Sequence, residues 1–135
     1  MQVGGPQEWV PPQPPCEVKA GHFRVTSAIV DLQNAATKVN ARERLLKDAN
    51  DVLTRALTQD KQDKNPAAWY YLGRYYVETK DAPGADSAFQ RAVALAPQCK
   101  DDIDHHRERL WVDVINGGLT AWQENKLDSA KLLLR

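Results

Sequence analysis

The sequence is poor in the residues that would place it in several large classes of protein. Cysteine occurs only twice among 135 residues, which is too few for a disulfide scaffold and gives neither the spacing of a zinc site nor a C-x-x-C redox motif. Charge of one sign is not in excess, because 18 Lys and Arg balance 18 Asp and Glu, so nothing marks a nucleic-acid binder. No apolar run is long enough to cross a bilayer. What remains is a globular chain with the length of one small domain.

Motifs of catalysis are missing as well. The sequence contains no Gly-rich phosphate loop, no H-E-x-x-H motif and no nucleophile elbow. Gly117 and Gly118 are adjacent, and we interpret them as a helix-packing pair rather than as part of a phosphate site. The sequence therefore predicts a protein without enzyme activity and without a cofactor.

The amino terminus has no recognisable export signal. Its first residues, MQVGGPQEWVPPQPP, contain neither a basic region nor an apolar stretch. Five prolines between Pro6 and Pro15 exclude a helix and favour polyproline II, so residues 1–22 are predicted to form an extended tail that acts as a stiff linker. Two interpretations stay open: a cytoplasmic protein, or an exported protein (periplasmic or extracellular) whose signal has been removed. We favour export.

One run, residues 66–99, carries the strongest pattern in the chain. It begins with the order W-x2-L-G-x2-Y and continues with small and aromatic residues at the spacing of a helix–turn–helix unit. This run resembles a complete unit of the tetratricopeptide repeat family, which implies a pair of antiparallel helices and a protein that binds partners rather than substrates. The residues that carry the resemblance are Trp69, Leu72, Gly73, Tyr76, Ala85, Ala88, Phe89, Ala92 and Pro97.

The local chemistry of this run supports the same unit. Asn65 is a natural N-cap, and Pro66 suits the first turn of a helix. Asp81, Pro83 and Gly84 are typical of the turn between two helices. The resemblance further implies that four larger side chains pack the two helices together: Trp69, Leu72, Tyr76 and Phe89.

Weaker copies of this unit are predicted on both sides. Residues 28–63 contain two apolar stripes with helical spacing, separated near Asn40, and are interpreted as a degenerate repeat. Residues 100–110 are interpreted as a charged insertion. Residues 111–135 are interpreted as a truncated third repeat, because two small residues in them recur at the spacing of the central unit. Residues 23–135 are therefore predicted to be all-α, a short right-handed superhelical stack of antiparallel helix pairs.

Members of the family bind partners on a concave face formed by the first helices of successive repeats. Carried onto this sequence, that face mixes aromatic, aliphatic and arginine side chains, which suits an extended peptide or a helix of a protein partner. The carboxylate clamp that some members use for chaperone termini is not expected, because the third repeat offers aliphatic residues at those places. The predicted groove consists of Asn34, Lys38, Tyr70, Arg74, Val77, Glu78, Ile115, Leu119, Trp122 and Gln123.

A second function stays open, that of a self-assembling structural subunit. Open-ended repeats stack end to end into an oligomer or filament, and an array without a polar cap leaves an apolar edge to be covered. The cover is the Trp9–Pro15 tail, a second copy of the chain or the next subunit, and we expect a second copy and hence a homo-oligomer. The predicted edge consists of Leu127, Ala130, Leu133 and Leu134.

The two cysteines allow two states. Cys16 and Cys99 both lie in segments that are predicted to be non-helical. They either stay as free thiols or form a disulfide that ties the tail to the end of the central repeat. The compartment in which the protein resides decides between the two.

One cluster of acids and histidines lies within residues 101–108. On a helix, Asp101 shares a face with His105, and Asp102 shares a face with His106. The cluster either holds a metal in part or is the solvated, salt-bridged start of a helix. We favour the second interpretation and predict no metal site, because zinc needs three or four converging ligands. The cluster consists of Asp101, Asp102, Asp104, His105, His106 and Glu108.

Overall fold

The computed structural model describes residues 8–133, and it places every side chain in that range except those of residues 120–122 and 125–133. This part of the chain is all-α, as predicted, and contains no strand. Its five α-helices are α1 (Phe23–Thr37), α2 (Arg42–Thr58), α3 (Pro66–Glu78), α4 (Ala82–Leu95) and α5 (Lys100–Leu133). The connections contain the short 3-10 helices η1 (Val39–Ala41), η2 (Gln62–Lys64) and η3 (Pro97–Cys99).

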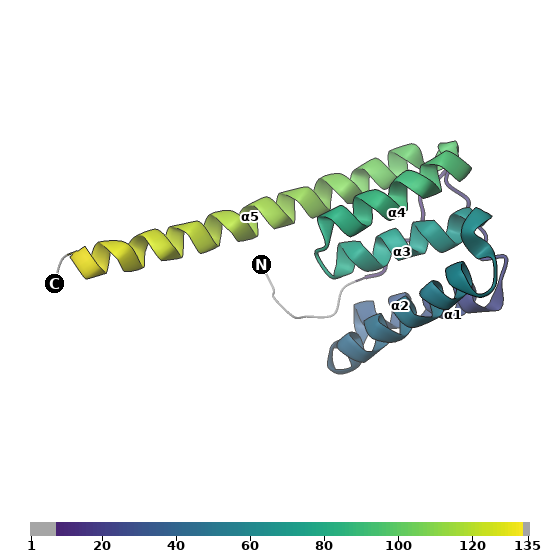
Figure 1. Ribbon diagram of the computed structural model, residues 1–135, viewed down its shortest axis with the longest axis horizontal. Coiled ribbons are helices and arrows are strands. Elements are labelled where there is room, and N and C mark those ends of the chain that lie inside the picture. The colour runs from purple at the N-terminus through teal and green to yellow at the C-terminus, as the bar shows by residue number, and fades with distance from the viewer. Residues whose placement is uncertain (1–7, 134–135) are drawn as a thin grey trace.

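The first four helices form two antiparallel pairs, α1 with α2 and α3 with α4 (Figure 1). Helix α3 lies at the centre, because it contacts α1, α2, α4 and α5. The pairs are those predicted for residues 28–63 and 66–99. The two helices of the first pair are connected through η1, which contains Asn40, the position near which the break between them was predicted.

The central pair begins each helix with the predicted chemistry. The side chain of Asn65 accepts a hydrogen bond from the N–H of Ala67, and Pro66 occupies the first turn of α3. The side chain of Asp81 accepts from the N–H of Gly84 at the start of α4. These caps satisfy N–H groups that have no partner inside a helix, so they fix where α3 and α4 begin.

The core depends on a close approach between α3 and α4. Phe89 is fully buried, and a Cβ atom at position 73 would lie 2.4 Å from its ring. Gly73 is therefore required where the two helices meet, as the predicted packing of the central repeat implies. Leu72 is also buried, as predicted. The largest fully buried apolar and aromatic side chains are Tyr70, Phe89, Leu32, Leu53, Ile103, Leu110 and Val25.

The predicted core position of Trp69 is only partly correct. Trp69 and Tyr76 are half-buried and pack against the edge of the core. The indole N–H of Trp69 donates to the main-chain oxygen of Asp63 (2.7 Å), and the guanidinium of Arg91 lies 4.8 Å from the ring. Because the indole keeps a polar partner in the loop before α3, one side of the ring stays near solvent.

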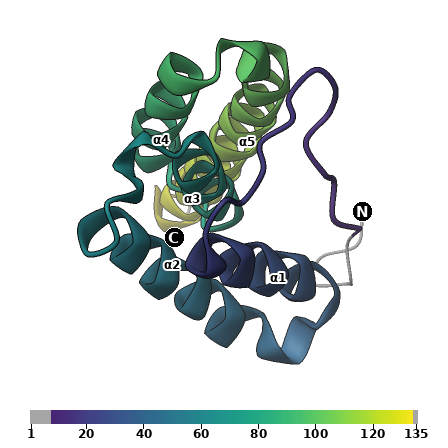
Figure 2. The ribbon, with the colours of Figure 1, turned by 90° about the vertical axis from the view of Figure 1, so that its right-hand side faces the viewer.

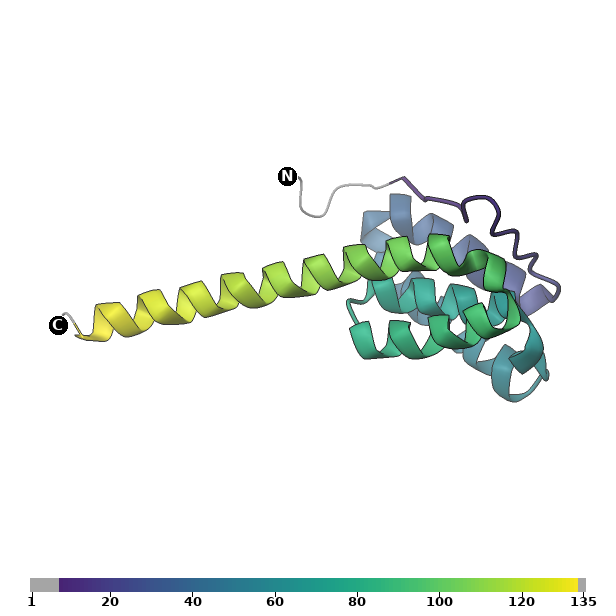
Figure 3. The same cartoon turned by 90° about the horizontal axis from the view of Figure 1, so that it is seen from above.

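The carboxyl-terminal region differs from the prediction. In place of the expected insertion at 100–110 and helix pair at 111–135, the described residues form one continuous helix, α5, which extends well beyond both helix pairs (Figures 1 and 3). The turn that a third helix pair requires within residues 111–135 is absent from the described part of α5. Residues 124–134 contain no Gly or Pro to force a turn, unlike the α3–α4 connection, and they are rich in good helix formers. The side chains of the predicted self-association edge, residues 127–134, lie outside the described residues.

The described part of the predicted tail is attached to the helices. Residues 8–22, which we call the strap, cross the open side of the molecule between α5 and α1 (Figure 2). A disulfide joins Cys16 to Cys99, and both residues are buried. Of the two states that the sequence allowed, free thiols or a disulfide, the structure has the disulfide. This bond is consistent with an oxidising, extracytoplasmic compartment. None of the described helices has the length and apolarity needed to cross a membrane.

Candidate functional site

A cavity of about 530 Å³ lies between α1, α3, α5 and the beginning of the strap. Its apolar wall comes from Ala36 on α1 and Val77 on α3, and its remaining walls are mostly charged. The full lining consists of Glu8, Trp9, Val10, Ala36, Arg74, Val77, Glu78, Lys80, His106, Arg109 and Asp113.

A buried chain of hydrogen bonds lies next to this cavity. Nη1 of Arg74 donates to the hydroxyl oxygen of Tyr70 (2.9 Å), and the Tyr70 hydroxyl donates to Oδ2 of Asp102 (2.6 Å). Arg74 is only 3% exposed and Asp102 only 7%. Buried charges are costly unless they are paired and hydrogen-bonded. The Tyr70 hydroxyl meets this need by linking the cation on α3 to the carboxylate on α5.

The strap adds one hydrogen bond to each of the two charged groups. Nη2 of Arg74 donates to the main-chain oxygen of Val10 (2.7 Å), and the N–H of Gln13 donates to Oδ1 of Asp102 (2.8 Å). The guanidinium of Arg74 also lies 4.1 Å from the ring of Trp9, in a cation–π contact. The charged pair therefore holds three successive parts of the strap: an aromatic side chain, a carbonyl and an N–H.

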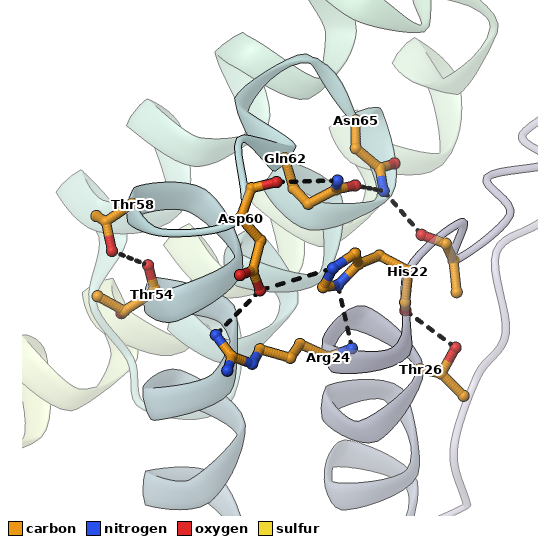
Figure 4. Close-up of polar contacts among 9 residues, drawn as sticks. His22, Arg24, Thr26, Thr54, Thr58, Asp60, Gln62 and Asn65 are labelled. Carbon is orange, nitrogen blue, oxygen red and sulfur yellow. Dashed lines mark hydrogen bonds and ion pairs between the residues drawn. The ribbon is translucent and has the colours of Figure 1, made fainter.

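The other end of the strap is fixed at the junction of α1 and the α2–α3 loop (Figure 4). Nδ2 of Asn65 donates to the main-chain oxygen of Ala20 (2.7 Å), while Nδ1 of His22 accepts from the N–H of Arg24 and caps α1. The carboxylate of Asp60 pairs with Arg24 (3.0 Å) and lies 3.6 Å from His22. The strap is thus attached at the cavity, at the disulfide and at the start of α1.

His106 is buried beside the charged pair. Its Nε2 lies 3.6 Å from Oδ2 of Asp102. Burial, reinforced by the positive charge of Arg74 and only partly opposed by Asp102, lowers the pKa of His106 to about 4. Burial also raises the pKa of the Tyr70 hydroxyl, so Tyr70 keeps the proton that it donates to Asp102.

The predicted groove is only partly assembled at this site. Arg74, Val77 and Glu78 line the cavity. Tyr70 and Arg74, however, are buried rather than exposed, so the prediction of a free surface at these two positions is wrong. The physical reason is the strap. Its carbonyl and N–H groups form the hydrogen bonds with Arg74 and Asp102 that water would otherwise form.

The remaining predicted groove residues lie away from the cavity. Asn34 is half-buried and Lys38 is exposed, whereas the contribution of α1 to the cavity is Ala36. Ile115, Leu119 and Gln123 are exposed on α5 beyond Asp113, the last residue of that helix in the lining. The side chain of Trp122 lies outside the described residues.

The acidic and histidine cluster at the start of α5 is divided between two faces. Asp102 and His106 are buried under the strap, whereas Asp101 and His105 are exposed. Asp104 pairs with Lys100 (2.6 Å), as expected for a salt-bridged helix start. The predicted solvated start is therefore correct for one face of α5 only. In the described part of the chain, no three His, Cys, Asp or Glu side chains are grouped as metal ligands.

Comparisons with known proteins return nothing similar: no protein family, curated protein or solved structure matches this chain. The tetratricopeptide resemblance therefore rests on the residue pattern of 66–99 alone.

Proposed function

We propose that this chain is a non-catalytic, tetratricopeptide-like interaction module that binds an extended segment of a protein partner at the cavity between α1, α3 and α5. In this proposal the helix pairs and α5 are a short right-handed repeat stack, and the partner meets its concave side. One observation carries the proposal. The surface formed by Arg74, Asp102 and the adjoining cavity, which we call the groove, already holds an extended polypeptide. Strap residues 9–13 are bound there by Arg74 and Asp102.

The contacts made to the strap are those that a peptide-binding groove requires. Val10 and Gln13 are held through a carbonyl and an N–H, which every peptide offers, whereas Trp9 adds a contact that depends on its side chain. The cavity beside them, about 530 Å³, falls within the range of roughly 300–1,000 Å³ that is typical of binding clefts. A partner segment that takes the place of strap residues 9–13 therefore finds further room beside them.

Arg109 supplies a charge that a partner is able to use. It lines the cavity from α5, and it makes no ion pair within the described residues. By contrast, the neighbouring Lys80 is paired with Asp113 (2.7 Å), and Glu78 is paired with Arg42 (2.8 Å). A partner segment with an acidic group therefore finds an unoccupied cation at this wall.

Arg109→Glu is expected to weaken partner binding while leaving the fold intact, because the side chain is exposed and surface substitutions cost little stability. The probe is a displayed library of random peptides of about 12 residues, selected against the disulfide-bonded wild-type chain. We expect the selected peptides to bind Arg109→Glu about tenfold more weakly than wild type. Arg55→Glu, the same charge change on an exposed part of α2, is the matched control. Failure to enrich any peptide, or equal binding to the two variants, would contradict the proposal.

A second candidate function, self-association, is favoured by apolar side chains exposed on α5. Trp111, Val112, Ile115 and Leu119 are between 43% and 56% exposed, and the helical periodicity places them along one broad side of the helix. Contiguous apolar surface of this kind marks interaction sites. A second copy of the chain is the occupant that we propose for it.

Leu119→Glu tests self-association. We expect wild-type chains to associate as concentration rises and the variant to stay monomeric, because a charge on this apolar side opposes its burial. Sedimentation velocity over a concentration series measures both. A wild-type protein that remains monomeric throughout would rule out self-association and leave the peptide-binding module.

We also propose that the protein works outside the cytoplasm, in the periplasm or extracellular space. The support is the Cys16–Cys99 disulfide, because such bonds form and persist in oxidising compartments.

A further inference from the structure

We infer that the groove recognises extended segments in which an aromatic residue is followed by prolines, and that the strap is its resident ligand, which an external peptide of the same chemistry must displace. This recognition rests on the proposed function, because the same groove must bind peptides at all. What it adds is the chemical class of the partner.

The aromatic requirement comes from Arg74. Its guanidinium is held in one orientation by two donated hydrogen bonds, to the hydroxyl of Tyr70 (2.9 Å) and to the carbonyl of Val10 (2.7 Å). The ring of Trp9 lies 4.1 Å from this fixed planar cation. A planar aromatic side chain is the partner that a fixed guanidinium face selects.

The proline requirement comes from the spacing of the two main-chain contacts. The carbonyl of Val10 and the N–H of Gln13 are held, and the two residues between them are Pro11 and Pro12. Proline has no N–H to leave without a partner, and it holds the chain extended before binding, which lowers the entropy cost of docking. At Val10 the hydrogen bond is made by the main-chain carbonyl, and the side chain is exposed at the edge of the cavity.

The strap competes strongly because it is tethered. Trp9 lies seven residues from the anchor at Cys16, and a short tether gives an effective concentration on the order of millimolar. Reduction of the disulfide lengthens the tether to the fourteen residues between Trp9 and Phe23, which lowers that concentration only about threefold by its −3/2 power dependence on length. Reduction alone therefore does not empty the groove, and a ligand must outcompete the strap itself.

The test uses the full chain and a labelled, end-blocked peptide with the sequence of residues 8–15, EWVPPQPP. Trp9→Ala combined with Pro12→Gly loosens the strap, because it removes the stacked ring and restores backbone freedom. We expect the peptide to bind this loosened-strap variant at least about tenfold more tightly than wild type in fluorescence anisotropy. Glu17→Ala is the matched control: it changes an exposed strap side chain that does not line the cavity, and it is expected to bind the peptide as weakly as wild type.

Two further measurements locate the contact. A peptide in which alanine replaces the tryptophan is expected to lose about tenfold in affinity for the loosened-strap variant. Arg74→Lys in the same background keeps the charge but loses the planar face, and it is expected to weaken the intact peptide without affecting the alanine peptide. If Arg74→Lys does not fold, as judged by its melting curve, the alanine peptide alone carries this part of the test.

Equal affinity of the peptide for wild type and the loosened-strap variant, or equal affinity of the intact and alanine peptides, overturns the inference. If library-selected peptides bind the loosened-strap variant and EWVPPQPP does not, the groove binds peptides of another chemistry and only the inference is lost. If neither binds, the inference and the proposed function both fail.

Discussion

Phe89→Ala is expected to lower the free energy of unfolding by about 3–5 kcal/mol, the cost of removing a buried phenylalanine ring. The ring is fully buried between α3 and α4, lies 6.1 Å from the ring of Tyr70, and fills the space above Gly73. A small domain has a total stability of roughly 5–15 kcal/mol, so this loss is a large share of it. Guanidinium unfolding followed by circular dichroism measures the change.

Trp69→Ala is the matched control for this prediction. The indole is half-buried, so its removal is expected to cost about 1–2 kcal/mol, within the range of ordinary substitutions. The two aromatic residues belong to the same repeat pattern and differ in burial. Equal losses from the two variants would contradict the placement of Trp69 at the edge of the core.

Removal of the disulfide by Cys16→Ala with Cys99→Ala is expected to lower stability by about 4 kcal/mol in the chain-entropy model. The bond connects residues separated by 83 positions, and cross-linking so long a loop strongly restricts the unfolded chain. Both positions are buried, and alanine avoids placing a hydroxyl there without a hydrogen-bond partner.

Denaturant unfolding of the double variant and of wild type, with and without reductant, measures this contribution. Reduced wild type is expected to match the double variant, and oxidised wild type is expected to be the more stable form. The intact mass under non-reducing conditions reports the bond directly. Two free thiols in oxidised, folded wild-type protein would contradict the bond itself.

The helix pairs could be predicted from the sequence because their determinants are local. The apolar spacing in residues 28–57 and the caps at Asn65 and Asp81 act within a few residues of where they stand. The continuous α5 was not predicted from the sequence, because the local signals for a turn in this region are weak. Asn125 has no Gly or Pro beside it and therefore favours a turn only weakly. The good helix formers around it determine that the helix continues.

The candidate site was harder to predict because its contacts join distant parts of the chain. Arg74 contacts Val10, 64 positions away, and Asp102 contacts Gln13, 89 positions away. Nothing in the spacing around Tyr70 or Arg74 indicates that another segment covers them. One signal was available for Trp9: a large aromatic residue in a rigid proline-rich segment close to a cysteine has a surface that needs burial.

The same long separations fix the order in which the molecule can fold. Each helix pair is formed by neighbours in sequence, and local contacts form quickly because little loop entropy is lost. The strap has no such neighbour, since its partners Cys99 and Asp102 come 83 and 89 positions after Cys16 and Gln13. On a chain that emerges amino terminus first, the disulfide and the contact with Asp102 must wait until the first turns of α5 exist. During that interval the thiol of Cys16 is unprotected and open to bonding with another chain, so correct maturation depends on how fast the carboxyl-terminal half arrives.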